Sequence, residues 1–440
     1  MTSAVRGHLW RNWSGLEEAV PRHVETPTSV EEVVDAVRRA RAAGRTVKMT
    51  GTGHSFTAIA APEHTLLCPD GLAGILAVDR TAMTVTARAG TALTDLNLAL
   101  ERLGLSLHNM GDIAEQTLAG ATSTGTHGTG GTAAGLAAQL AGLELVTGTG
   151  EVVRASATEN PDVFEVARVG LGALGILTSL TFHVEPLFVL EAHEQPMTWD
   201  RGLAAYDDMV AAAHHVDLYW FPHTDRLMVK QNVRTDLDPG EQQPPSRAAA
   251  WWEDELVSNT VFGGLCRLGE RAPALVPHIN RVAGRAQSER RYSDLAHRVF
   301  VTPRRVRFRE MEYAVPREVG LDVLRECRRV IDASDWRIAF PVEVRTARAD
   351  DIPLSTSYGR DTVYLAFHVP AGTDHRDYFG GLEPILRDAG GRPHWGKLHT
   401  RTAADLAPSY DRFGDFLALR DRLDPDRVFA NEHLRRILGD

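Results

Sequence analysis

Cysteine is scarce in this chain. Cys68, Cys266 and Cys327 are the three that occur in 440 residues, and they lie far apart in the sequence. A small extracellular domain held together by disulfides has an even number of cysteines at close spacing, which this sequence lacks. The pattern therefore predicts reduced thiols and a cytoplasmic location.

Long apolar runs and excess positive charge are also lacking. No run of 18 apolar residues occurs, which argues against a membrane-spanning helix. The N-terminal segment has no apolar core of the kind found in secretory signal peptides. The formal net charge of -10 argues against nucleic acid as a partner. A length of 440 residues with 43% hydrophobic and 24% charged residues is typical of a globular protein of two domains.

The best-known nucleotide-binding motifs are missing, yet two glycine-rich stretches are present. In the first, TGTGHSF (Thr50–Phe56), Phe56 stands where a Rossmann fingerprint needs its third glycine. A P-loop needs a lysine, and none occurs between Lys48 and Lys230. The second stretch, Gly111–Gly131, repeats the mixture of glycine, serine and threonine seen in the first.

Glycine and small hydroxyl residues together suit phosphate binding. Gly51 and Gly53 permit positive φ and a close approach of the backbone to a ligand. Successive backbone N–H groups can then form a concave nest for phosphate oxygens. Neither stretch contains a basic side chain, so main-chain dipoles would have to hold the phosphates. Two surface turns are the alternative interpretation, but both stretches together, with His54 in the first, predict a site for a dinucleotide cofactor with a pyrophosphate.

The segments around the first stretch have an α/β pattern. Pro27–Gly44 is predicted to be a helix because its valines recur at helical spacing, and Thr46–Met49 is predicted to be a strand that leads into the glycine loop. A second unit follows, with a strand at Met83–Gly90 and a helix whose leucines from Leu93 to Leu103 lie on one face.

Strands dominate the prediction further along the chain. Glu144–Val153 is predicted to be a hairpin, and Gly172–Val184 a glycine turn that leads into an alternating strand. Pro186 marks a predicted domain boundary. The second domain mixes strands with helices such as Arg317–Ser334, and the polar segment Leu237–Arg247 is predicted to be a surface loop.

Four motifs in this order resemble one family. TGTGHSF after a strand, GD-I-x-x-QT-x-AG-x-x-STGTHGTG, PVEVR and HWGK are similar to motifs of the sugar-1,4-lactone oxidoreductases, and the similarity runs from Trp10 to the C-terminus. These enzymes include L-gulono-1,4-lactone and D-arabinono-1,4-lactone oxidases and dehydrogenases, which are FAD enzymes of the vanillyl-alcohol-oxidase type. The resemblance implies an α+β protein with the two-domain vanillyl-alcohol-oxidase/PCMH-type FAD-binding fold and a mixed α/β substrate cap domain. Residues 1–187 would form the FAD-binding domain, residues 188–402 the cap, and residues 403–440 a segment returning to the FAD domain.

The resemblance also implies which residues bind FAD. The candidate residues come from three segments: the two glycine-rich stretches and the turn before an expected strand. The candidates are Thr50, Gly51, Thr52, Gly53, His54, Ser55, Phe56, Gly111, Asp112, Thr117, Gly120, Ala121, Ser123, Thr124, Gly125, His127, Gly128, Gly175 and Ile176. In the family, a histidine at the place of His54 is bonded to the 8α-methyl of the flavin. The alternative is that His54 only hydrogen-bonds phosphate. The second stretch contains no cysteine, so a second covalent bond is not expected.

Glu343 and Arg345 are the first candidate catalytic and substrate-binding residues. They stand two apart in FPVEVRT, so in a strand they point to the same face. A carboxylate beside a guanidinium can bind several sugar hydroxyls, although spacing alone would equally suit a structural ion pair. The resemblance matches both positions to substrate recognition.

Lys397 is the third candidate catalytic residue, and it lies in RPHWGKLHT with His394. The resemblance places the lysine at the junction of flavin and substrate, where a cation could stabilise developing negative charge. A solvated loop lysine is the alternative. His394 and Asp112 are candidate substrate-binding residues as well, and Asp112 could instead be a turn cap. No acidic residue lies between His394 and His399, so no metal is predicted.

The function implied by the resemblance is FAD-dependent oxidation of the C2 alcohol of an aldono-1,4-lactone. L-gulono-, L-galactono- or D-arabinono-1,4-lactone would yield an ascorbate-type product, and oxygen or another acceptor would take the electrons. An alditol oxidase of the same fold and a flavin-binding protein without catalysis are the alternatives.

Gly111 bears on the electron acceptor. In the plant-type dehydrogenases of the family, an alanine at the aligned position goes with exclusion of oxygen. Glycine lacks the methyl group of alanine, so the resemblance implies room for oxygen. Alternatively, Gly111 could serve a turn with positive φ.

Overall fold

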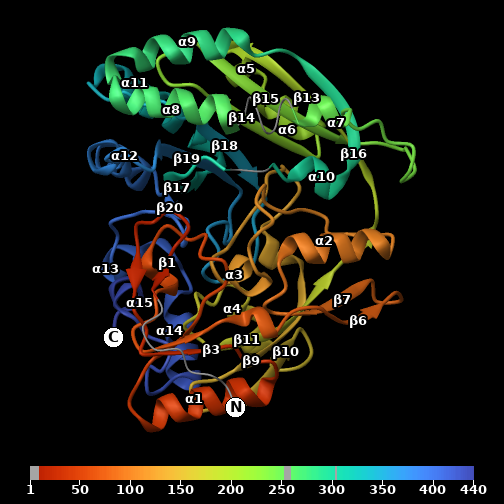
Figure 1. Ribbon diagram of the computed structural model, residues 1–440, viewed down its shortest axis with the longest axis vertical. Helices are drawn as coiled ribbons and strands as arrows, with labels where there is room; N and C mark the ends of the chain where they lie inside the picture. Colours follow the sequence, from red (N-terminus) through yellow and green to blue (C-terminus); the bar gives the residue numbers. More distant parts are fainter. Residues whose placement is uncertain (1–8, 252–258, 303–304) are drawn as a thin grey trace.

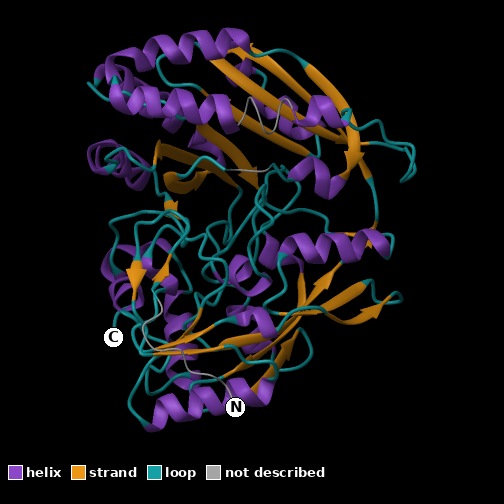
Figure 2. Ribbon diagram, in the orientation of Figure 1, coloured by secondary structure: helices purple, strands orange, loops and turns teal. Residues whose placement is uncertain are grey.

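The computed structural model describes residues 9–251, 259–302 and 305–440. Its strands form two main groups, one below the other in the view of Figure 1, and loops lie between them (Figure 2). The mixture of antiparallel sheets with separate helices belongs to the α+β class, as the sequence predicts. None of the described helices has the length and apolar character needed to cross a lipid bilayer.

The lower group is built from the first 186 residues. Its elements are β1 (Trp10–Arg11), β2 (Glu18–Ala19), β3 (His23–Glu25), α1 (Val30–Ala42), β4 (Val47–Met49), β5 (Thr65–Leu67), β6 (Ile75–Asp79), β7 (Thr84–Arg88), α2 (Leu93–Arg102), β8 (Leu105–Ser106), α3 (Leu118–Ser123), β9 (Leu140–Val146), β10 (Val152–Ser156), α4 (Pro161–Ala167), β11 (Ile176–His183) and β12 (Glu185–Pro186). A parallel sheet has the order β3-β5-β4, and an antiparallel sheet has the order β10-β9-β11-β7-β6. The hairpin predicted over Glu144–Val153 is confirmed by the pairing of β9 with β10.

Local sequence explains why α1 forms where it does. The Ser29 side chain accepts a hydrogen bond from the backbone N–H of Glu32, and the Glu32 carboxylate accepts one from the backbone N–H of Thr28. This reciprocal cap satisfies donors that a helix start leaves free. Val33 and Val37 are fully buried and pack with Val47 of β4, so the helix fixes the strand that leads into the first glycine stretch.

The upper group consists of one eight-stranded sheet and its helices. The elements are β13 (Val189–Thr198), α5 (Trp199–Ala204), α6 (Tyr206–Ala212), β14 (His215–Trp220), β15 (Arg226–Arg234), α7 (Arg247–Ala250), α8 (Phe262–Arg271), α9 (Val276–Ala286), β16 (Arg290–Leu295), α10 (Ala296–Phe300), β17 (Phe308–Pro316), α11 (Gly320–Ala333), β18 (Val342–Ala347), β19 (Thr362–Pro370), α12 (Arg376–Asp388) and β20 (Arg392–Pro393). The strand order is β16-β13-β15-β14-β18-β19-β17-β20. Helices α5, α6, α11 and α12 bury their apolar side chains against this sheet in one core cluster.

The last segment packs on the lower group. It contains α13 (Ala403–Leu406), α14 (Phe413–Leu423) and α15 (Glu432–Leu438). Phe416 and Ile437 are fully buried in the core cluster of the five-stranded sheet. The Asn431 side-chain amide donates to the backbone carbonyls of Ala58 and Ala61, so the tail supports the segment that follows the first glycine stretch.

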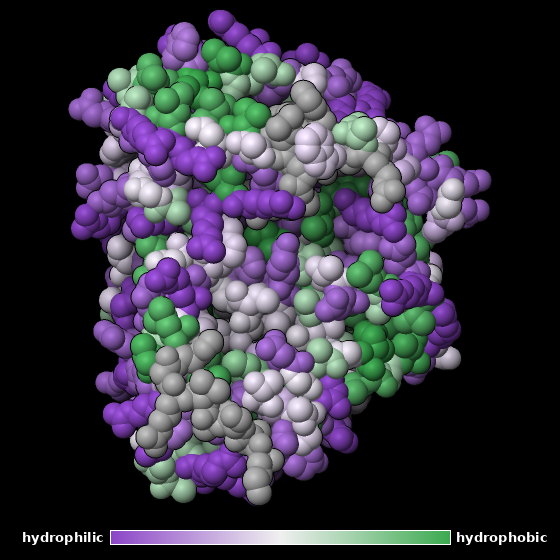
Figure 3. Space-filling view, viewed as in Figure 1, coloured by the Kyte–Doolittle hydropathy of each residue, from purple (hydrophilic) through white to green (hydrophobic). Residues whose placement is uncertain are grey.

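The second glycine stretch ties the two groups together. The backbone N–H of Gly130 donates to the Thr346 carbonyl of β18, and the Thr129 hydroxyl donates to the Val216 carbonyl of β14. These bonds set the distance between the glycine loops and the sheet face above them. Apolar side chains that remain exposed include Leu268 of α8 and Val282 of α9. These two helices lie at the top of the molecule in Figure 1, where Figure 3 shows hydrophobic surface.

Candidate active site

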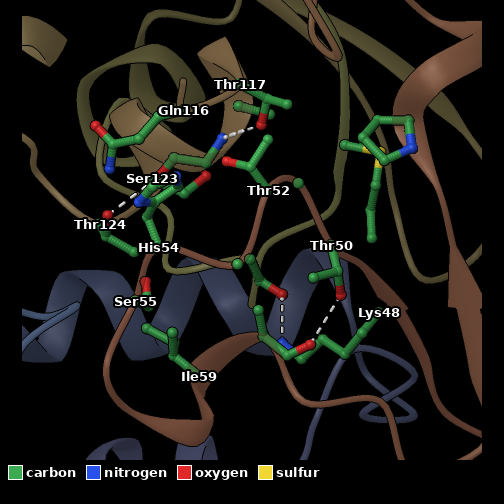
Figure 4. A pocket seen from close by; sticks show the side chains of 18 of the residues that line it. Lys48, Thr50, Thr52, His54, Ser55, Ile59, Gln116, Thr117, Ser123 and Thr124 are labelled. Atoms are coloured by element: carbon green, nitrogen blue, oxygen red, sulfur yellow. Dashed lines mark hydrogen bonds between the residues drawn. The ribbon is translucent and has the colours of Figure 1, made fainter. Parts of the chain in front are cut away.

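Both predicted glycine stretches line one cavity, which we call the first cavity (Figure 4). A third wall comes from the turn before β11. The lining residues are Trp10, Lys48, Met49, Thr50, Gly51, Thr52, Gly53, His54, Ser55, Thr57, Ile59, Ala60, Pro69, Gln116, Thr117, Ala119, Gly120, Ser123, Thr124, Leu171, Gly172, Gly175, Ile176 and Leu177. Backbone amides and small hydroxyls dominate this wall, which fits a ligand with phosphate groups.

Two glycines of the first stretch are required for different reasons. Gly53 has a φ of +73°, a conformation that disfavours side chains. Gly51 has no positive φ, but a Cβ there would overlap the Thr117 side chain. Thr117 caps α3 by accepting from the Gly120 backbone N–H at 3.3 Å. The close approach of Gly51 to Thr117 therefore joins the two stretches into one binding surface.

His54 lies where the first cavity meets a second one, and it lines both. Its ring stacks on the Trp13 indole, with centroids 5.6 Å apart and an interplanar angle of 22°. Burial lowers the pKa of His54; the Glu115 carboxylate opposes this shift, and the Lys397 ammonium adds to it. The imidazole is therefore neutral near pH 7, with a nitrogen lone pair able to act as a nucleophile.

The second cavity lies between the glycine stretches and the sheet face formed by β17, β18 and β19. Its lining residues are Trp13, His54, Ser55, Phe56, Gly111, Asp112, Ile113, Gln116, Thr124, Thr126, His127, Phe308, Glu310, Glu312, Glu343, Arg345, His368, His394, Gly396 and Lys397. All the residues predicted to act in catalysis or substrate binding line this cavity. Their roles stay predictions, but the fold brings them together from distant parts of the chain.

Arg345 is the centre of a buried cluster of charge. Its guanidinium lies 2.5 Å from a carboxylate oxygen of Glu343, 3.1 Å from one of Asp112 and 3.0 Å from one of Asp217. Burial raises the pKa of Asp217, which the Arg345 charge opposes. Asp112 therefore takes part in an ion pair, and Asp217 on β14 belongs to the cluster although no sequence motif predicts it.

Lys397 forms a second ion pair on the same face. Its ammonium donates to the Glu310 carboxylate, and His368 Nε2 lies 3.5 Å from the other Glu310 oxygen. The pKa of Glu310 is about 2, because the charges of Lys397 and His368 outweigh the effect of its burial. The alternative of a solvated loop lysine is wrong, since the Lys397 side chain is 19% exposed and ion-paired.

Glu312, two residues along β17, lies between two histidines. His127 Nδ1 donates to the Gly128 carbonyl at 2.8 Å, which leaves His127 Nε2 facing a Glu312 oxygen at 3.2 Å. Two lone pairs repel at this distance, so a proton lies between these atoms. The pKa of Glu312 is lowered, because the His127 charge and hydrogen bond outweigh its burial.

The three residues His127, Glu312 and His394 also have the composition of a metal site, and their ligand atoms lie within 4.8 Å of one another. His394 Nδ1, however, accepts a hydrogen bond from the Gly396 backbone N–H. Burial lowers the pKa of His394 to about 3, so the ring is neutral and its proton is on Nε2. In such a ring Nε2–H is a hydrogen-bond donor, so the ring cannot ligate a metal through that nitrogen. The arrangement suits hydrogen bonding to a polyhydroxylated ligand better than metal binding.

Comparison with known proteins identifies the family. Residues 180–437 match the family model of D-arabinono-1,4-lactone oxidase, and residues 21–156 match that of an FAD binding domain. The chain belongs to the D-arabinono-1,4-lactone oxidase family. The predicted resemblance is confirmed, and so is FAD as the cofactor.

Three known proteins align with nearly the whole length of this chain. L-gulono-1,4-lactone dehydrogenase of Mycobacterium tuberculosis is 40% identical over 98% of this chain and 99% of its own. L-gulonolactone oxidase of Bos taurus is 32% identical over 99% of this chain and 100% of its own. Alditol oxidase of a Streptomyces species is 33% identical over 97% of this chain and 98% of its own.

The fold resembles that of a crystallised flavoenzyme. Cholesterol oxidase from B. sterolicum superposes with a TM-score of 0.83 at 18% identity, covering 99% of this chain and 97% of that one. At this identity the likeness concerns the fold alone, and it confirms the predicted PCMH-type architecture.

Some predicted cofactor residues of this family member lie behind the cavity walls. Ala121, Gly125 and Gly128 line neither cavity. Ala121 is fully buried in α3, and Gly125 serves a turn with a φ of +74°. A Cβ at Gly128 would overlap Asn109, so this glycine allows two segments to pack closely.

The structure contradicts one of the two interpretations of Gly111. It lines the second cavity, and its φ is not positive, so the turn interpretation is wrong. A Cβ on Gly111 would lie 3.2 Å from the His127 carbonyl oxygen and 3.3 Å from the Thr126 methyl carbon. A methyl group there would therefore fill the space tightly.

Several charged residues of this site are not among those predicted from the sequence. Glu310 and Glu312 alternate in FREMEY as Glu343 and Arg345 do in PVEVR, which is a signal that could have found them. Lys48 lines the first cavity, although the sequence does not predict it as a cofactor-binding residue.

Proposed function

We propose that this protein oxidises the C2 alcohol of an aldono-1,4-lactone, such as L-gulono-, L-galactono- or D-arabinono-1,4-lactone, to an ascorbate-type product. The observation that carries the proposal is the wall of paired charges, Glu343–Arg345 and Glu310–Lys397, which faces His54 across the second cavity. The names of the relatives support the same substrate class.

The paired charges suit a neutral, polyhydroxylated substrate. Glu343 and Asp112 can accept hydrogen bonds from sugar hydroxyls while Arg345 pairs with both and holds them in place. His394 can donate its Nε2 proton to a ring or carbonyl oxygen of the lactone. We therefore assign Asp112, Glu343, Arg345, His394 and Lys397 to substrate binding.

The catalytic roles fall to Glu343, Arg345 and Lys397. The C2 carbon gives up its hydrogen with the bonding electron pair, and the C2 hydroxyl gives up its proton to the Glu343 carboxylate, which lines the cavity beside Arg345. FAD, when bound, supplies the two-electron acceptor. The Lys397 ammonium stabilises the negative charge that develops on the C2 oxygen, and its ion pair with Glu310 holds it in place.

We further propose that His54 is covalently linked to the flavin. Its neutral imidazole, stacked on Trp13 at the junction of the two cavities, supports this.

The division into residues 1–187, 188–402 and 403–440 is part of the proposal, and the single sheet formed by β13 to β20 supports the cap. The three unpaired cysteines support a cytoplasmic location.

An alditol oxidase is the second candidate, because one relative of 33% identity carries that name. Either oxygen or another acceptor can complete the cycle, and Gly111 lines the second cavity beside His127, without the methyl group that an alanine would add there.

Anaerobic titration tests the proposal. The purified holoenzyme is mixed without air with L-gulono-, L-galactono- and D-arabinono-1,4-lactone, and separately with xylitol and sorbitol, and the flavin absorbance is followed. Bleaching by a lactone at lower concentration than by any polyol is the expected result. Preferential bleaching by polyols would establish the alditol oxidase, and no bleaching by either class would leave a flavin-binding protein without this catalysis.

A further inference from the structure

Lysine is almost absent from this protein, and its positions are informative. The chain has 48 basic residues other than histidine, of which Lys48, Lys230 and Lys397 are the three lysines. None of the three is exposed. Lys397 pairs with Glu310, and Lys230 donates to the Val299 carbonyl at 2.8 Å. Arginine thus supplies the surface charge, and lysine is found at internal positions where its chemistry differs from that of arginine.

Lys48 lies in the wall of the first cavity. It is in β4, directly before the first glycine stretch, and its residue is 3% exposed. Among the described residues that line this cavity, it is the single lysine or arginine. Its ammonium donates to the Gly172 carbonyl at 3.0 Å, so the side chain reaches from β4 to the turn before β11.

The charge of Lys48 is poorly compensated by the protein. Within the described part of the chain, no carboxylate lies within 4.0 Å of its ammonium. Asp424 and Glu63 are the acids that act on it, and His433 faces it from α15. The Asp424 carboxylate already accepts hydrogen bonds from the backbone N–H groups of Val428 and Phe429.

Burial makes this amine able to change its charge near neutral pH. The pKa of Lys48 is lowered to about 7 by burial, against the opposing charges of Asp424 and Glu63. An arginine in this place would remain charged, whereas a lysine can lose its proton when no anion is near. An anionic ligand in the cavity would restore the charged form.

We propose that Lys48 binds the diphosphate of FAD and that its amine takes up a proton when FAD binds. Backbone amides of the glycine stretches then share the two phosphate charges with one buried cation. The inference does not depend on which sugar is oxidised, because it concerns only the cofactor.

The test uses protein carrying His54→Ala, so that the flavin can be exchanged. The FAD is stripped by dialysis against chaotropic salt, and FAD and riboflavin are titrated while their fluorescence is followed. Lys48→Met is expected to weaken FAD binding by about 10- to 100-fold, the size of one charge-assisted contact. Riboflavin lacks the diphosphate, so its affinity should change by less than about threefold. Lys230→Met is the matched control, because Lys230 also donates to a backbone carbonyl but lines neither cavity.

Calorimetry in two buffers of different ionisation enthalpy measures the proton. At pH 7.5 the parent, which here is the His54→Ala protein, should take up roughly half a proton or more per FAD bound. The same protein with Lys48→Met should take up none. Lys48→Arg should keep the preference for FAD over riboflavin without proton uptake.

The melting temperature of the stripped protein separates a ligand contact from a structural one. A lysine whose folded pKa lies below its unfolded value destabilises the empty fold at pH 7, and this penalty disappears as the pH approaches the unfolded value. Stripped Lys48→Met protein should therefore have a melting temperature equal to or above that of the stripped parent. Addition of FAD should raise the melting temperature of Lys48→Met by less than it raises that of the parent. An equal loss of FAD and riboflavin affinity, or proton uptake that persists in Lys48→Met, would assign Lys48 to its bond with Gly172 alone and overturn the proposal.

Discussion

Replacing Arg345 by alanine is expected to affect both stability and catalysis. One guanidinium pairs with three carboxylates, those of the buried Glu343 and Asp217 and of the partly exposed Asp112, at 2.5 to 3.1 Å. Breaking a single buried ion pair costs about 3–5 kcal/mol, because it leaves an uncompensated charge in the interior. Since three acids lose their partner together, we expect a loss of unfolding free energy of at least about 3 kcal/mol at pH 8.

The loss should depend on pH with a definite sign. Burial already raises the pKa of Asp217, and removal of the Arg345 charge raises it further. A carboxyl group whose folded pKa lies above its unfolded value, about 3.9 for aspartate, destabilises the fold above that value. The destabilisation should therefore be smaller at pH 5, where the acids can bind protons, than at pH 8.

Urea unfolding at pH 5 and pH 8, followed by tryptophan fluorescence, measures this difference. Arg325→Ala is the matched control, because Arg325 pairs with Asp322 at 2.6 Å on the surface of α11. Exposed pairs contribute about 0–1 kcal/mol, so this control should unfold as the parent does. Arg345→Lys keeps a charge without the planar fork, and it should recover more stability than activity.

Catalysis provides the second measurement on Arg345→Ala. We expect kcat/KM for the lactone to fall by about 10²-fold or more, which is about 2.7 kcal/mol of transition-state binding, with flavin content near normal. Glu343→Ala should have an effect of the same order. Normal kinetics in a correctly folded Arg345→Ala protein would remove Arg345 from the site, and a stability loss that grows toward pH 5 would refute the electrostatic reasoning.

Three further predictions concern the cofactor and its surroundings. In the parent, acid precipitation should leave the yellow colour in the pellet, and His54→Ala should release it to the supernatant; colour in the supernatant of the parent would disprove the linkage. The parent should form hydrogen peroxide from lactone and air. Gly111→Ala should slow reoxidation by oxygen more than reduction by substrate in stopped-flow traces, and equal slowing of both would remove Gly111 as the gate. Glu312→Gln should lower the unfolding free energy by about 1.5–3 kcal/mol, because His127 loses a charged partner, whereas Glu318→Gln on the surface should change it little.

The elements that the sequence predicts correctly are those with strong local signals. The helix α1 follows from the spacing of its valines, and the β9–β10 hairpin from a glycine-rich turn. The glycine stretches were also evident, because close backbone approach to phosphate restricts the residue types that a loop can use. Such signals depend on neighbours in the chain, so they can be read without the fold.

Charge pairing was decided by the tertiary structure. The spacing of Glu343 and Arg345 predicts a shared face, but Asp112 and Asp217 reach the same guanidinium from other elements. Whether Lys397 was solvated or paired depended on Glu310, which lies 87 positions away. Local periodicity contains no information on such distant partners.

By itself, therefore, the sequence determined the elements, the glycine-rich cofactor loops and the candidate pair on β18. The tertiary structure decided which loop glycines need positive φ, which carboxylates share Arg345, and that Lys48 is buried in the cofactor cavity. The physical reason is that burial and long-range contacts set the charge state of an ionisable group, whereas residue type and spacing set only where that group can point.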